Sequence, residues 1–296
     1  MDHKSGFANI IGNPNAGKST LMNVLVGERL SIITYKAQTT RQRIFGILNG
    51  EDFQLVFSDT PGIVSPSYKL HEAMLAEISE ALSDADIFLL VIDVADKEKP
   101  APEIIDRIKK SGRPVIVVLN KMDLVKPDLL FGLADYWTKE IPGSEIIPVS
   151  ALKEKNTDRL LDLVKSLLPV HPPYFDKEGL SDKTLRFFAA EIIREKIFIH
   201  CEKEVPYATQ VVIDAYREED HIDRISATIF VERESQKGIL IGKAGTMLKR
   251  IGTDARIEIE KFTGKKAFLE LFVKVAPNWR NDPKGLKKFG FRNPEP

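Results

Sequence analysis

The sequence contains a single cysteine, Cys201, among its 296 residues. One thiol cannot form an internal disulfide, and no second cysteine is available for a zinc site of the usual spacings. Disulfide-stapled folds and cysteine–zinc sites are therefore excluded. We interpret Cys201 as a small buried apolar residue.

Long apolar runs are also missing. The longest extends from Ile87 to Val94, contains Asp93, and falls far short of the roughly 18 residues that a membrane-spanning helix needs. The N-terminal residues Met1 to Gly6 are polar and lack the apolar core of a signal peptide. We expect a soluble, cytoplasmic protein, with peripheral contact to the inner membrane as the alternative.

The chain has no net charge, because 43 Lys and Arg balance 43 Asp and Glu. The two signs are unevenly distributed, however. Lys237 to Arg292 contains 14 Lys and Arg but five Asp and Glu, a net charge of +9. This asymmetry indicates a polyanionic partner for the C-terminal part.

The length predicts two domains, because a domain usually has about 100 to 200 residues. Between residues 7 and 168, short β-rich runs alternate with helical patterns and give six strands and five helices. Nearly continuous apolar strands separated by helices predict a largely parallel sheet buried on both faces. Asn49-Gly50 predicts one hairpin. We expect a doubly wound α/β domain over residues 1–168.

A second domain is expected after a linker. Residues 169–182 contain three prolines followed by a polar stretch and predict the linker. Residues 183–296 predict a smaller α+β domain of the order αββααβ, with a basic tail. Its expected elements are a helix over 184–200, strands over 209–216 and 224–232, helices around 237–250 and 254–263, and a strand over 266–275.

The segment Gly12 to Ser19, GNPNAGKS, fits the pattern G-x-x-x-x-G-K-[ST] between a predicted strand and a predicted helix. In such a loop, glycines let main-chain N–H groups surround phosphates, and the helix N-terminus adds a favourable dipole. We expect Lys18 to reach the β and γ phosphates and Ser19 to bind Mg²⁺. The predicted phosphate-site residues are Gly12, Asn13, Pro14, Asn15, Ala16, Gly17, Lys18, Ser19 and Thr20.

The segment Asp59 to Gly62, DTPG, follows another apolar strand. Asp59 is therefore expected at the carboxyl end of that strand, near the phosphates, where it can hold Mg²⁺. Gly62 can donate its N–H to the γ-phosphate, a contact that exists with GTP and not with GDP. The polar segment 34–43 contains Thr39 and Thr40, either of which can close over Mg²⁺, and we favour Thr40.

The segment Asn120 to Asp123, NKMD, predicts which base is bound. An ionised carboxylate only accepts hydrogen bonds. Guanine offers N1–H together with an amine, whereas adenine has an acceptor at N1 and no amine at C2. Asp123 therefore predicts guanine, with discrimination of roughly 10⁴ to 10⁵. The predicted base-site residues are Asn120, Lys121 and Asp123, with main-chain support from Ser150, Ala151 and Leu152.

These motifs together resemble the translation-factor-like branch of P-loop GTPases over residues 6–168. The resemblance implies GTP and GDP as ligands, Mg²⁺ as cofactor, and hydrolysis involving Lys18, Thr40 and Gly62. Ile63 departs from small signalling GTPases, because its apolar side chain cannot orient water as their glutamine does. Asn15 matches an asparagine that ligates K⁺ in some GTPases of this branch, which leads to the hypothesis of K⁺-stimulated hydrolysis.

In the second predicted domain, Gly242 to Gly245, GKAG, precedes a helix that carries Lys249 and Arg250. This arrangement resembles a KH domain (type II-like), in which a G-x-x-G turn clamps about four nucleotides. The resemblance implies phosphate neutralisation by Lys243 and an adjacent apolar groove for bases. A simple helix–helix turn is the alternative. The predicted RNA-binding residues are Ile239, Ile241, Gly242, Lys243, Ala244, Gly245, Lys249 and Arg250.

The C-terminal tail interleaves basic and aromatic residues. Its cations are Lys284, Lys287, Lys288 and Arg292, and its aromatic residues are Trp279, Phe289 and Phe291. Two alternatives are open: the tail adds phosphate contacts and base stacking, or it is a disordered basic tail.

The succession of a P-loop GTPase, a Pro-rich linker and a KH domain, with VERESQKG at 231–238 and IGKAG at 241–245, resembles a bacterial family of ribosome-assembly GTPases over essentially the whole chain. The resemblance implies assembly of the small ribosomal subunit and binding of the 3′ end of its ribosomal RNA under control of the GTP state. No stable oligomer is expected. The alternatives are an RNA-binding scaffold with a structural guanine nucleotide, and a GTPase serving RNA modification or membrane recruitment.

Overall fold

The computed structural model describes residues 3–34, 36, 38–63 and 66–291. The chain forms two compact units, each with its own hydrophobic core. The first unit consists of Met1–Ser31, Thr40–Ser65 and Met74–Asp182, and the second of Ile32–Thr39, Pro66–Ala73 and Lys183–Pro296.

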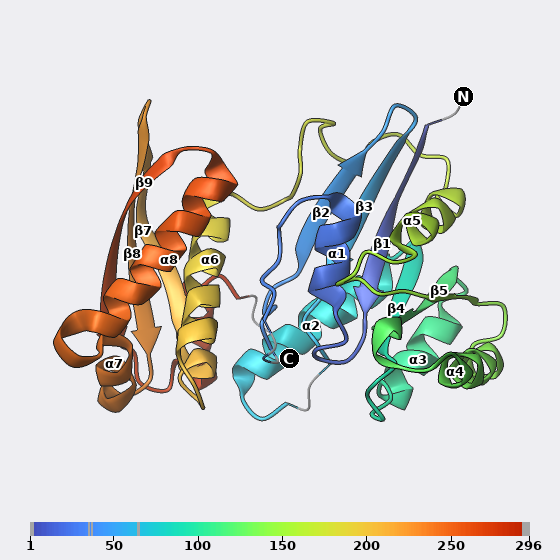
Figure 1. The fold of residues 1–296 in the computed structure, drawn as a ribbon, viewed down its shortest axis with the longest axis horizontal. Coiled ribbons are helices and arrows are strands. Elements are labelled where there is room, and N and C mark those ends of the chain that lie inside the picture. Colours follow the sequence, from blue (N-terminus) through green and yellow to red (C-terminus); the bar gives the residue numbers. More distant parts are fainter. Residues whose placement is uncertain (1–2, 35, 37, 64–65, 292–296) are drawn as a thin grey trace. The chain divides into compact units, whose positions relative to one another are not determined.

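A six-stranded sheet forms the centre of the first unit (Figure 1). Its strands, in spatial order, are β2 (Ile44–Asn49), β3 (Phe53–Asp59), β1 (Lys4–Ile11), β4 (Ile87–Asp93), β5 (Val115–Asn120) and β6 (Glu145–Pro148). All neighbouring strands are parallel except β2 and β3, which are antiparallel. The predicted α/β class and the predicted hairpin at Asn49-Gly50 are confirmed.

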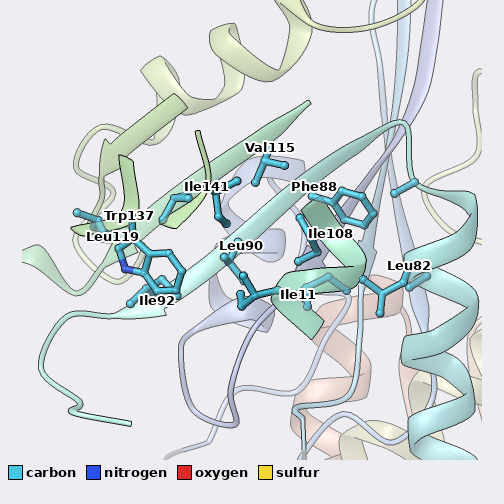
Figure 2. Packing of buried hydrophobic residues seen from close by; sticks show 14 of the residues in the cluster. Ile11, Leu82, Phe88, Leu90, Ile92, Ile108, Val115, Leu119, Trp137 and Ile141 are labelled. Carbon is cyan, nitrogen blue, oxygen red and sulfur yellow. The ribbon is translucent and has the colours of Figure 1, made fainter. Parts of the chain in front are cut away.

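In the described part of the chain, five α-helices accompany these strands, as predicted: α1 (Lys18–Val26), α2 (Lys69–Asp84), α3 (Pro102–Lys110), α4 (Pro127–Glu140) and α5 (Thr157–Ser166). Residues of α2, α3 and α4 form one hydrophobic cluster with alternate residues of β4 and β5, including Leu90, Leu119 and Trp137 (Figure 2). The intervening residues Val91 and Val118 are also fully buried. Both faces of the sheet are therefore covered, as its apolar strands predict.

The polar stretch 169–182 belongs to the first unit and packs against its sheet. Gln54 of β3 accepts hydrogen bonds at Oε1 from the main-chain N–H groups of Tyr174 and Phe175, at 2.7 and 2.9 Å. The ring of Tyr174 lies 4.8 Å from that of Phe7 in an edge-to-face arrangement. Hydrogen bonds and aromatic contacts thus fix a segment whose own apolar content is small.

The second unit has the predicted order αββααβ. Its elements are α6 (Leu185–His200), β7 (Gln210–Glu218), β8 (Ile222–Val231), α7 (Glu234–Ile241), α8 (Thr246–Thr263) and β9 (Lys266–Val275). The sheet order is β7-β8-β9, with β7 antiparallel and β9 parallel to β8. The α+β class is confirmed.

The predicted boundary between the two middle helices is wrong. The interruption lies at Gly242–Gly245, where Gly242, Ala244 and Gly245 have positive φ angles of 72°, 50° and 77°. Positive φ ends a right-handed helix, and glycine adopts it readily. Residues 251–253, which lie between the two predicted helices 237–250 and 254–263, fall inside α8.

The C-terminal segment continues through a short 3₁₀ helix, η4 (Trp279–Asn281), and α9 (Pro283–Lys288). Trp279, Phe289 and Phe291 are buried, and Trp279 donates a hydrogen bond from Nε1 to the carbonyl of Ala208 at 2.9 Å. The prediction that these rings stack on bases is therefore wrong, because they pack inside the unit. Arg292 lies outside the described residues.

Two segments from the N-terminal half of the sequence belong to the second unit. In the first, Lys36 donates hydrogen bonds from Nζ to the carbonyls of Phe198 and Cys201 at the C-terminal end of α6, at 2.6 and 2.5 Å. The buried Arg194 of α6 also donates a hydrogen bond to the carbonyl of Thr39. Helix α6 thus holds the segment that leads directly into Thr40.

The second such segment, Pro66–Ala73, includes the start of α2. The guanidinium of Arg280 lies 4.6 Å from the centre of the Tyr68 ring, and Arg280 also pairs with Glu232 at 2.5 Å. Among the residues described, no helix is both long and apolar enough to cross a membrane.

Candidate nucleotide and RNA sites

The predicted phosphate loop connects β1 to α1 in the first unit. A Cβ atom on Gly12 would lie 2.3 Å from the carbonyl oxygen of Val91, and one on Gly17 would lie 2.3 Å from Nδ2 of Asn120. Gly17 also has a φ of 92°, which favours glycine. Both glycines of the pattern are therefore required, because a main-chain atom beside Gly12 and a side-chain atom beside Gly17 leave no space for a Cβ.

Lys18 is the buried cation of this loop. Its Nζ donates hydrogen bonds to the carbonyls of Gly12 and Asn13 at 2.9 and 2.8 Å. Burial lowers the pKa of Lys18 to about 8, while the negative charge of Asp59 partly offsets that shift. A buried ammonium group at the start of a helix can bind a polyphosphate.

Ser19, Thr40 and Asp59 come together, as the sequence predicts for a metal site. Asp59 Oδ2 accepts hydrogen bonds from Ser19 Oγ at 2.7 Å and Thr40 Oγ1 at 3.1 Å. The two hydroxyl oxygens are 3.0 Å apart. Three oxygen atoms that can act as metal ligands therefore lie close together: Thr40 Oγ1 from a loop, Ser19 Oγ from α1 and Asp59 Oδ2 from the end of β3.

The other carboxylate oxygen of Asp59 tests whether these residues fit Mg²⁺. Oδ1 is buried and has no hydrogen-bond partner in the described part of the chain. Burial raises the pKa of Asp59, and the Ser19 hydrogen bond and the Lys18 charge partly offset that rise. An unpartnered buried oxygen beside two hydroxyls fits a hard cation with oxygen ligands.

Gly62 and Ile63 follow this carboxylate. A Cβ atom on Gly62 would lie 2.7 Å from Cα of Pro14, so the main chain approaches the phosphate loop closely there. Ile63 is partly buried and packs against the hydrophobic cluster of the first unit. The side chain after Gly62 is therefore apolar and occupied with packing.

Asn120 connects the predicted base loop to the phosphate loop. Its Nδ2 donates a hydrogen bond to the carbonyl of Ala16 at 2.8 Å, and its Oδ1 accepts one from the main-chain N–H of Ala151 at 3.0 Å. Asn120 is only 2% exposed. One buried side chain thus fixes the positions of three loops that are distant in the sequence.

Asp123 is exposed and ionised. The hydroxyl of Ser150 is the main cause of its lowered pKa, and the charges of Lys153 and Lys155 lower it further. The side chain of Lys121 pairs with Asp93 at 2.5 Å. The arrangement leaves an acceptor carboxylate at the surface, as guanine recognition requires. Asp93 was not among the predicted residues, because no motif marks it.

The predicted nucleotide residues lie along the edge of the first unit's sheet where β1, β3, β5 and β6 end, and Thr40 lies near that edge because the antiparallel strand β2 begins there. Asn15 is exposed, with a φ of 62°, and Leu152 is 74% exposed, whereas Ala151 is buried. Ligands of doubly wound sheets bind at this edge. The predicted set is Gly12 to Thr20, Thr40, Asp59, Gly62, Asn120, Lys121, Asp123 and Ser150 to Leu152.

The predicted RNA turn lies between α7 and α8 in the second unit. A Cβ atom on Gly242 would lie 2.8 Å from Cβ of Met247, whereas one on Gly245 would meet open space but at a positive φ. Lys243 and Ala244 are exposed at the turn. The main chain is thus presented at the N-terminus of α8, where it can contact a phosphate.

A groove of about 390 Å³ begins at Gly245 and runs along α8 and β9. Leu248, Leu269 and Leu271 provide apolar surface in it, and Lys249 and Arg256 provide positive charge. The remaining lining residues are Gly245, Gly252 and Thr253. An apolar groove beside a glycine turn and two cations can accept bases and phosphates together.

Of the eight predicted RNA residues, Gly245 and Lys249 line this groove. The other six do not: Ile239, Ile241, Gly242, Lys243, Ala244 and Arg250. The missed residues were detectable in part. Leu248, Gly252 and Arg256 repeat at intervals of four, which places them on one helix face. Leu269 and Leu271 alternate along a strand, which places them on one sheet face.

Two family models match the chain. The model described as 50S ribosome-binding GTPase matches residues 7–121, and the KH domain model matches residues 204–280. GTPase Era of Syntrophus aciditrophicus is 48% identical over 97% of this chain and 95% of that protein. GTPase Era of Staphylococcus haemolyticus is 42% identical over 98% of each chain.

Solved structures of similar proteins have the same fold. A crystal structure of Era in complex with MgGDPNP and nucleotides 1506–1542 of 16S ribosomal RNA has a TM-score of 0.92 at 41% identity and covers 97% of this chain and 99% of that chain. A single-residue variant of Aquifex aeolicus Era bound to GDP and AlF₄⁻ gives the same TM-score, identity and coverage.

Proposed function

This chain belongs to the Era family of GTPases, and we propose that it is a GTP-hydrolysing switch that binds the 3′ end of small-subunit ribosomal RNA during assembly of that subunit. In this proposal residues 1–168 bind and hydrolyse GTP, residues 169–182 link the two domains, and residues 183–296 bind RNA. The site of action is the bacterial cytoplasm, where ribosomal subunits are assembled.

Nucleotide selection rests on Asp123 and Asn120. The ionised Asp123 carboxylate accepts hydrogen bonds from N1–H and the amine of guanine and would be left unpaired by adenine. Asn120 holds the base loop against the phosphate loop through its hydrogen bond to Ala16. The residues that bind the base and those that bind the phosphates are therefore connected directly. ATP is therefore rejected.

Phosphate binding rests on Lys18 and on the residues that would hold Mg²⁺, namely Ser19, Thr40 and Asp59. When bound, Mg²⁺ neutralises charge on the β and γ phosphates. Lys18 provides a second, fixed positive charge in a buried position. Related proteins have been crystallised with MgGDPNP and with GDP and AlF₄⁻, which supports this assignment.

The water molecule that attacks GTP must be oriented by a group other than a glutamine after Gly62. Ile63 packs into the hydrophobic cluster and has no polar group to orient water. Asn15 is exposed in the phosphate loop and offers a side-chain oxygen at its surface. We assign Asn15 to a K⁺ site beside the phosphates, which makes hydrolysis K⁺-dependent.

RNA binding rests on the groove that begins at Gly245. It combines a main-chain turn at a helix N-terminus, apolar leucines and two cations. A relative at 41% identity was crystallised with nucleotides 1506–1542 of 16S ribosomal RNA. In this proposal the turn contacts phosphates, the leucines contact bases, and Lys249 and Arg256 neutralise the backbone.

Coupling between GTP and RNA rests on the residues that flank Thr40 and Gly62. Helix α6 holds the chain as far as Thr39, and Arg280 holds Tyr68 a few residues after Gly62. Thr40 and Gly62 would change their contacts when the γ-phosphate is lost. GTP therefore favours the RNA-binding arrangement, and hydrolysis releases the RNA.

The convergence of Ser19 and Thr40 on one oxygen of Asp59, with the other oxygen unpartnered, carries the proposal. The test is multiple-turnover GTP hydrolysis with Mg²⁺, in K⁺ and Na⁺ buffers, with and without the 3′ end of small-subunit ribosomal RNA. We expect Mg²⁺-dependent turnover that is faster in K⁺. Equal rates in K⁺ and Na⁺ would refute the role of Asn15.

One alternative has an observation in its favour. The apolar Ile63 is also consistent with an RNA-binding scaffold that keeps a structural guanine nucleotide. Tight GTP binding without turnover under every condition would establish the scaffold and refute the switch. Identical RNA affinity with GTP and GDP would refute the coupling but leave hydrolysis intact.

A further inference from the structure

Two segments that adjoin the nucleotide site along the chain contact each other within the second unit. Residues 32–39 lead into Thr40, and residues 66–73 follow Gly62. Thr40 and Gly62 are the residues whose contacts are expected to depend on the γ-phosphate. A direct bond between the two segments therefore connects the two places at which loss of that phosphate would act.

His71 makes this bond. Its Nε2 lies 3.2 Å from Oε1 of Gln38. Its other ring nitrogen, Nδ1, accepts a hydrogen bond from the main-chain N–H of Ser67 at 3.3 Å. A nitrogen that accepts from a main-chain N–H carries no proton, so in the neutral ring the proton is on Nε2. Nε2 therefore donates to the side-chain carbonyl oxygen of Gln38.

The His71 ring is held in one orientation. It is 5% exposed, and its centre lies 3.8 Å from that of the Tyr68 ring. His71 also lies in the first turn of α2, so the helix fixes its main chain. A donor that is already fixed loses little conformational entropy when it bonds to Gln38.

Gln38 has an uncommon main-chain conformation. Its φ is 59°, in the left-handed region that is unfavourable for a residue with a Cβ. Such conformations persist where neighbouring groups fix them. The hydrogen bond from His71 is one such contact, two residues before Thr40. Loss of this bond therefore favours relaxation of the chain that enters Thr40.

Each of the two segments is also attached to the body of the second unit. Arg194 of α6 donates a hydrogen bond to the carbonyl of Thr39 in the first segment. The guanidinium of Arg280 in η4 lies 4.6 Å from the centre of the Tyr68 ring in the second segment. His71 thus connects two segments that are attached to different elements, α6 and η4.

A series of contacts continues from Arg280 to the RNA turn. Arg280 pairs with Glu232 at 2.5 Å. The main-chain N–H of Glu232 donates to Oε1 of the buried Gln236 at 3.0 Å. Gln236 lies on α7, which ends directly before Gly242, the first residue of the RNA turn. Packed and hydrogen-bonded groups therefore connect Tyr68 continuously to that turn.

We propose that His71 is a positioning residue that joins the two segments, so that they respond to the γ-phosphate together and transmit that response to the RNA turn. The inference rests on the proposed coupling between GTP and RNA. With the bond to Gln38 intact, a rearrangement at Thr40 reaches the start of α2 and the Tyr68 ring. Without the bond each segment responds separately, and part of the difference in RNA affinity between the GTP and GDP states is lost.

A purely local role for His71 at the start of α2 is the alternative. The hydrogen bond from Ser67 and the contact with Tyr68 both lie within four residues of His71 and shape the helix start by themselves. The bond to Gln38, in contrast, crosses from one segment to the other. Substitution of Gln38 therefore removes the connection and leaves the local contacts of His71 intact.

The test measures RNA affinity in two nucleotide states. An oligonucleotide of the 3′ end of small-subunit ribosomal RNA is titrated, by fluorescence anisotropy, with a non-hydrolysable GTP analogue present and with GDP present. Gln38→Met keeps the side-chain length and removes the acceptor oxygen. His71→Phe keeps a ring against Tyr68 and removes both ring nitrogens. The two substitutions are made singly and together as a double-mutant cycle, with melting temperatures to show that each variant is folded.

We expect each single substitution to lower the ratio of the two RNA affinities by about twofold to tenfold, the effect of one net hydrogen bond. The double variant should have the same ratio as His71→Phe, because Gln38→Met removes nothing further once the donor is absent. His171→Phe is the matched control and should leave the ratio unchanged. The His171 ring also stacks on a tyrosine, Tyr174, with ring centres 4.2 Å apart, but it lies in the first unit.

Three results would overturn the inference. A ratio that Gln38→Met does not change would confine His71 to its local role at the start of α2. Additive losses in the double variant would show that the two side chains act independently. Equal RNA affinity of the unsubstituted protein in both nucleotide states would refute the proposed coupling itself, and this inference with it, while GTP hydrolysis and RNA binding would stand.

Discussion

The side chain of Asn120 donates a hydrogen bond to the main-chain carbonyl of Ala16, 104 residues earlier in the sequence, at 2.8 Å. The same side chain accepts a hydrogen bond from Ala151. The phosphate loop and both base loops are therefore held together by hydrogen bonds within the protein itself. Such preorganisation lowers the conformational cost of binding.

Asn120→Ala should weaken GDP and GTP binding equally. The substitution removes both hydrogen bonds and leaves buried main-chain groups unpaired, which costs about 1–3 kcal/mol for each group. We expect affinity to fall by at least about tenfold, measured with a fluorescent guanine nucleotide. Unchanged affinity with a native melting temperature would show that the loops do not need this connection.

Asp123→Asn should relax the preference for guanine. An amide presents one donor and one acceptor in place of two acceptors, so it cannot pair with both N1–H and the amine. We expect GTP affinity to fall by about 100-fold or more, while affinity for XTP, which has a carbonyl in place of the amine, should rise. Competition between the two nucleotides measures the change. Retained preference for GTP would remove Asp123 from base recognition.

Nucleotide affinity should decline above about pH 8. The pKa of Lys18 is lowered to about 8 in the free protein, and bound phosphates favour its charged form and raise that pKa. Below pH 8 the lysine is charged before binding, so affinity is constant. Above it, binding takes up a proton, and affinity falls by up to about tenfold per pH unit.

Calorimetry of GDP binding between pH 7 and about 9, in buffers of different ionisation enthalpy, measures this proton uptake. Lys18→Ala should weaken binding and abolish the dependence on pH. A flat affinity profile for the unsubstituted protein would place the titration of Lys18 outside this range.

Gly245→Asp should weaken RNA binding without changing nucleotide affinity. The substitution puts negative charge at the turn where a phosphate would lie, and it also places a side chain at a φ of 77°. We expect at least about a tenfold loss, by electrophoretic mobility or fluorescence anisotropy. Gly112→Asp is the control, because Gly112 also has a positive φ and open space around it but lies in the first unit. Equal RNA binding by both variants would place the clamp elsewhere.

Arg194→Gln should lower the preference for GTP over GDP. The lost charge-assisted hydrogen bond to Thr39 frees the residue before Thr40, and Thr40 is expected to close over Mg²⁺ only when the γ-phosphate is present. At about 1.5 kcal/mol for such a bond, GTP affinity falls about tenfold while GDP affinity stays the same. Arg186→Gln is the matched control, since Arg186 also lies on α6 and donates to the carbonyl of Ile213. A parallel loss for both nucleotides would indicate general destabilisation.

Most of the first unit was predictable from local sequence. Each nucleotide motif directly follows an apolar strand, and parallel strands bring their carboxyl ends to one edge of the sheet. Glycines, a lysine and carboxylates at fixed spacings then identify the chemistry. The ion pair between Asp93 and Lys121 was missed because its two members are 28 residues apart and carry no pattern.

The second unit was predictable in element order but less so in detail. The turn at Gly242–Gly245 was recognised as a motif, but the predicted helices 237–250 and 254–263 were divided after Arg250 and not at that turn. The roles of Lys36 and Arg194 depend on contacts across more than 150 residues, which local patterns do not contain. The tail aromatics were misread because burial of a ring is a tertiary property.

The burial of Trp137 in the first unit and of Trp279 in the second gives each unit its own optical reporter. The chain has two tryptophans in all, and each is 2% exposed. Replacing either one with phenylalanine leaves a single indole, whose emission responds to loss of packing in its own unit. Denaturant titrations of the two single-tryptophan proteins therefore follow the unfolding of each unit separately, without an added label, and show whether guanine nucleotide protects one unit or both.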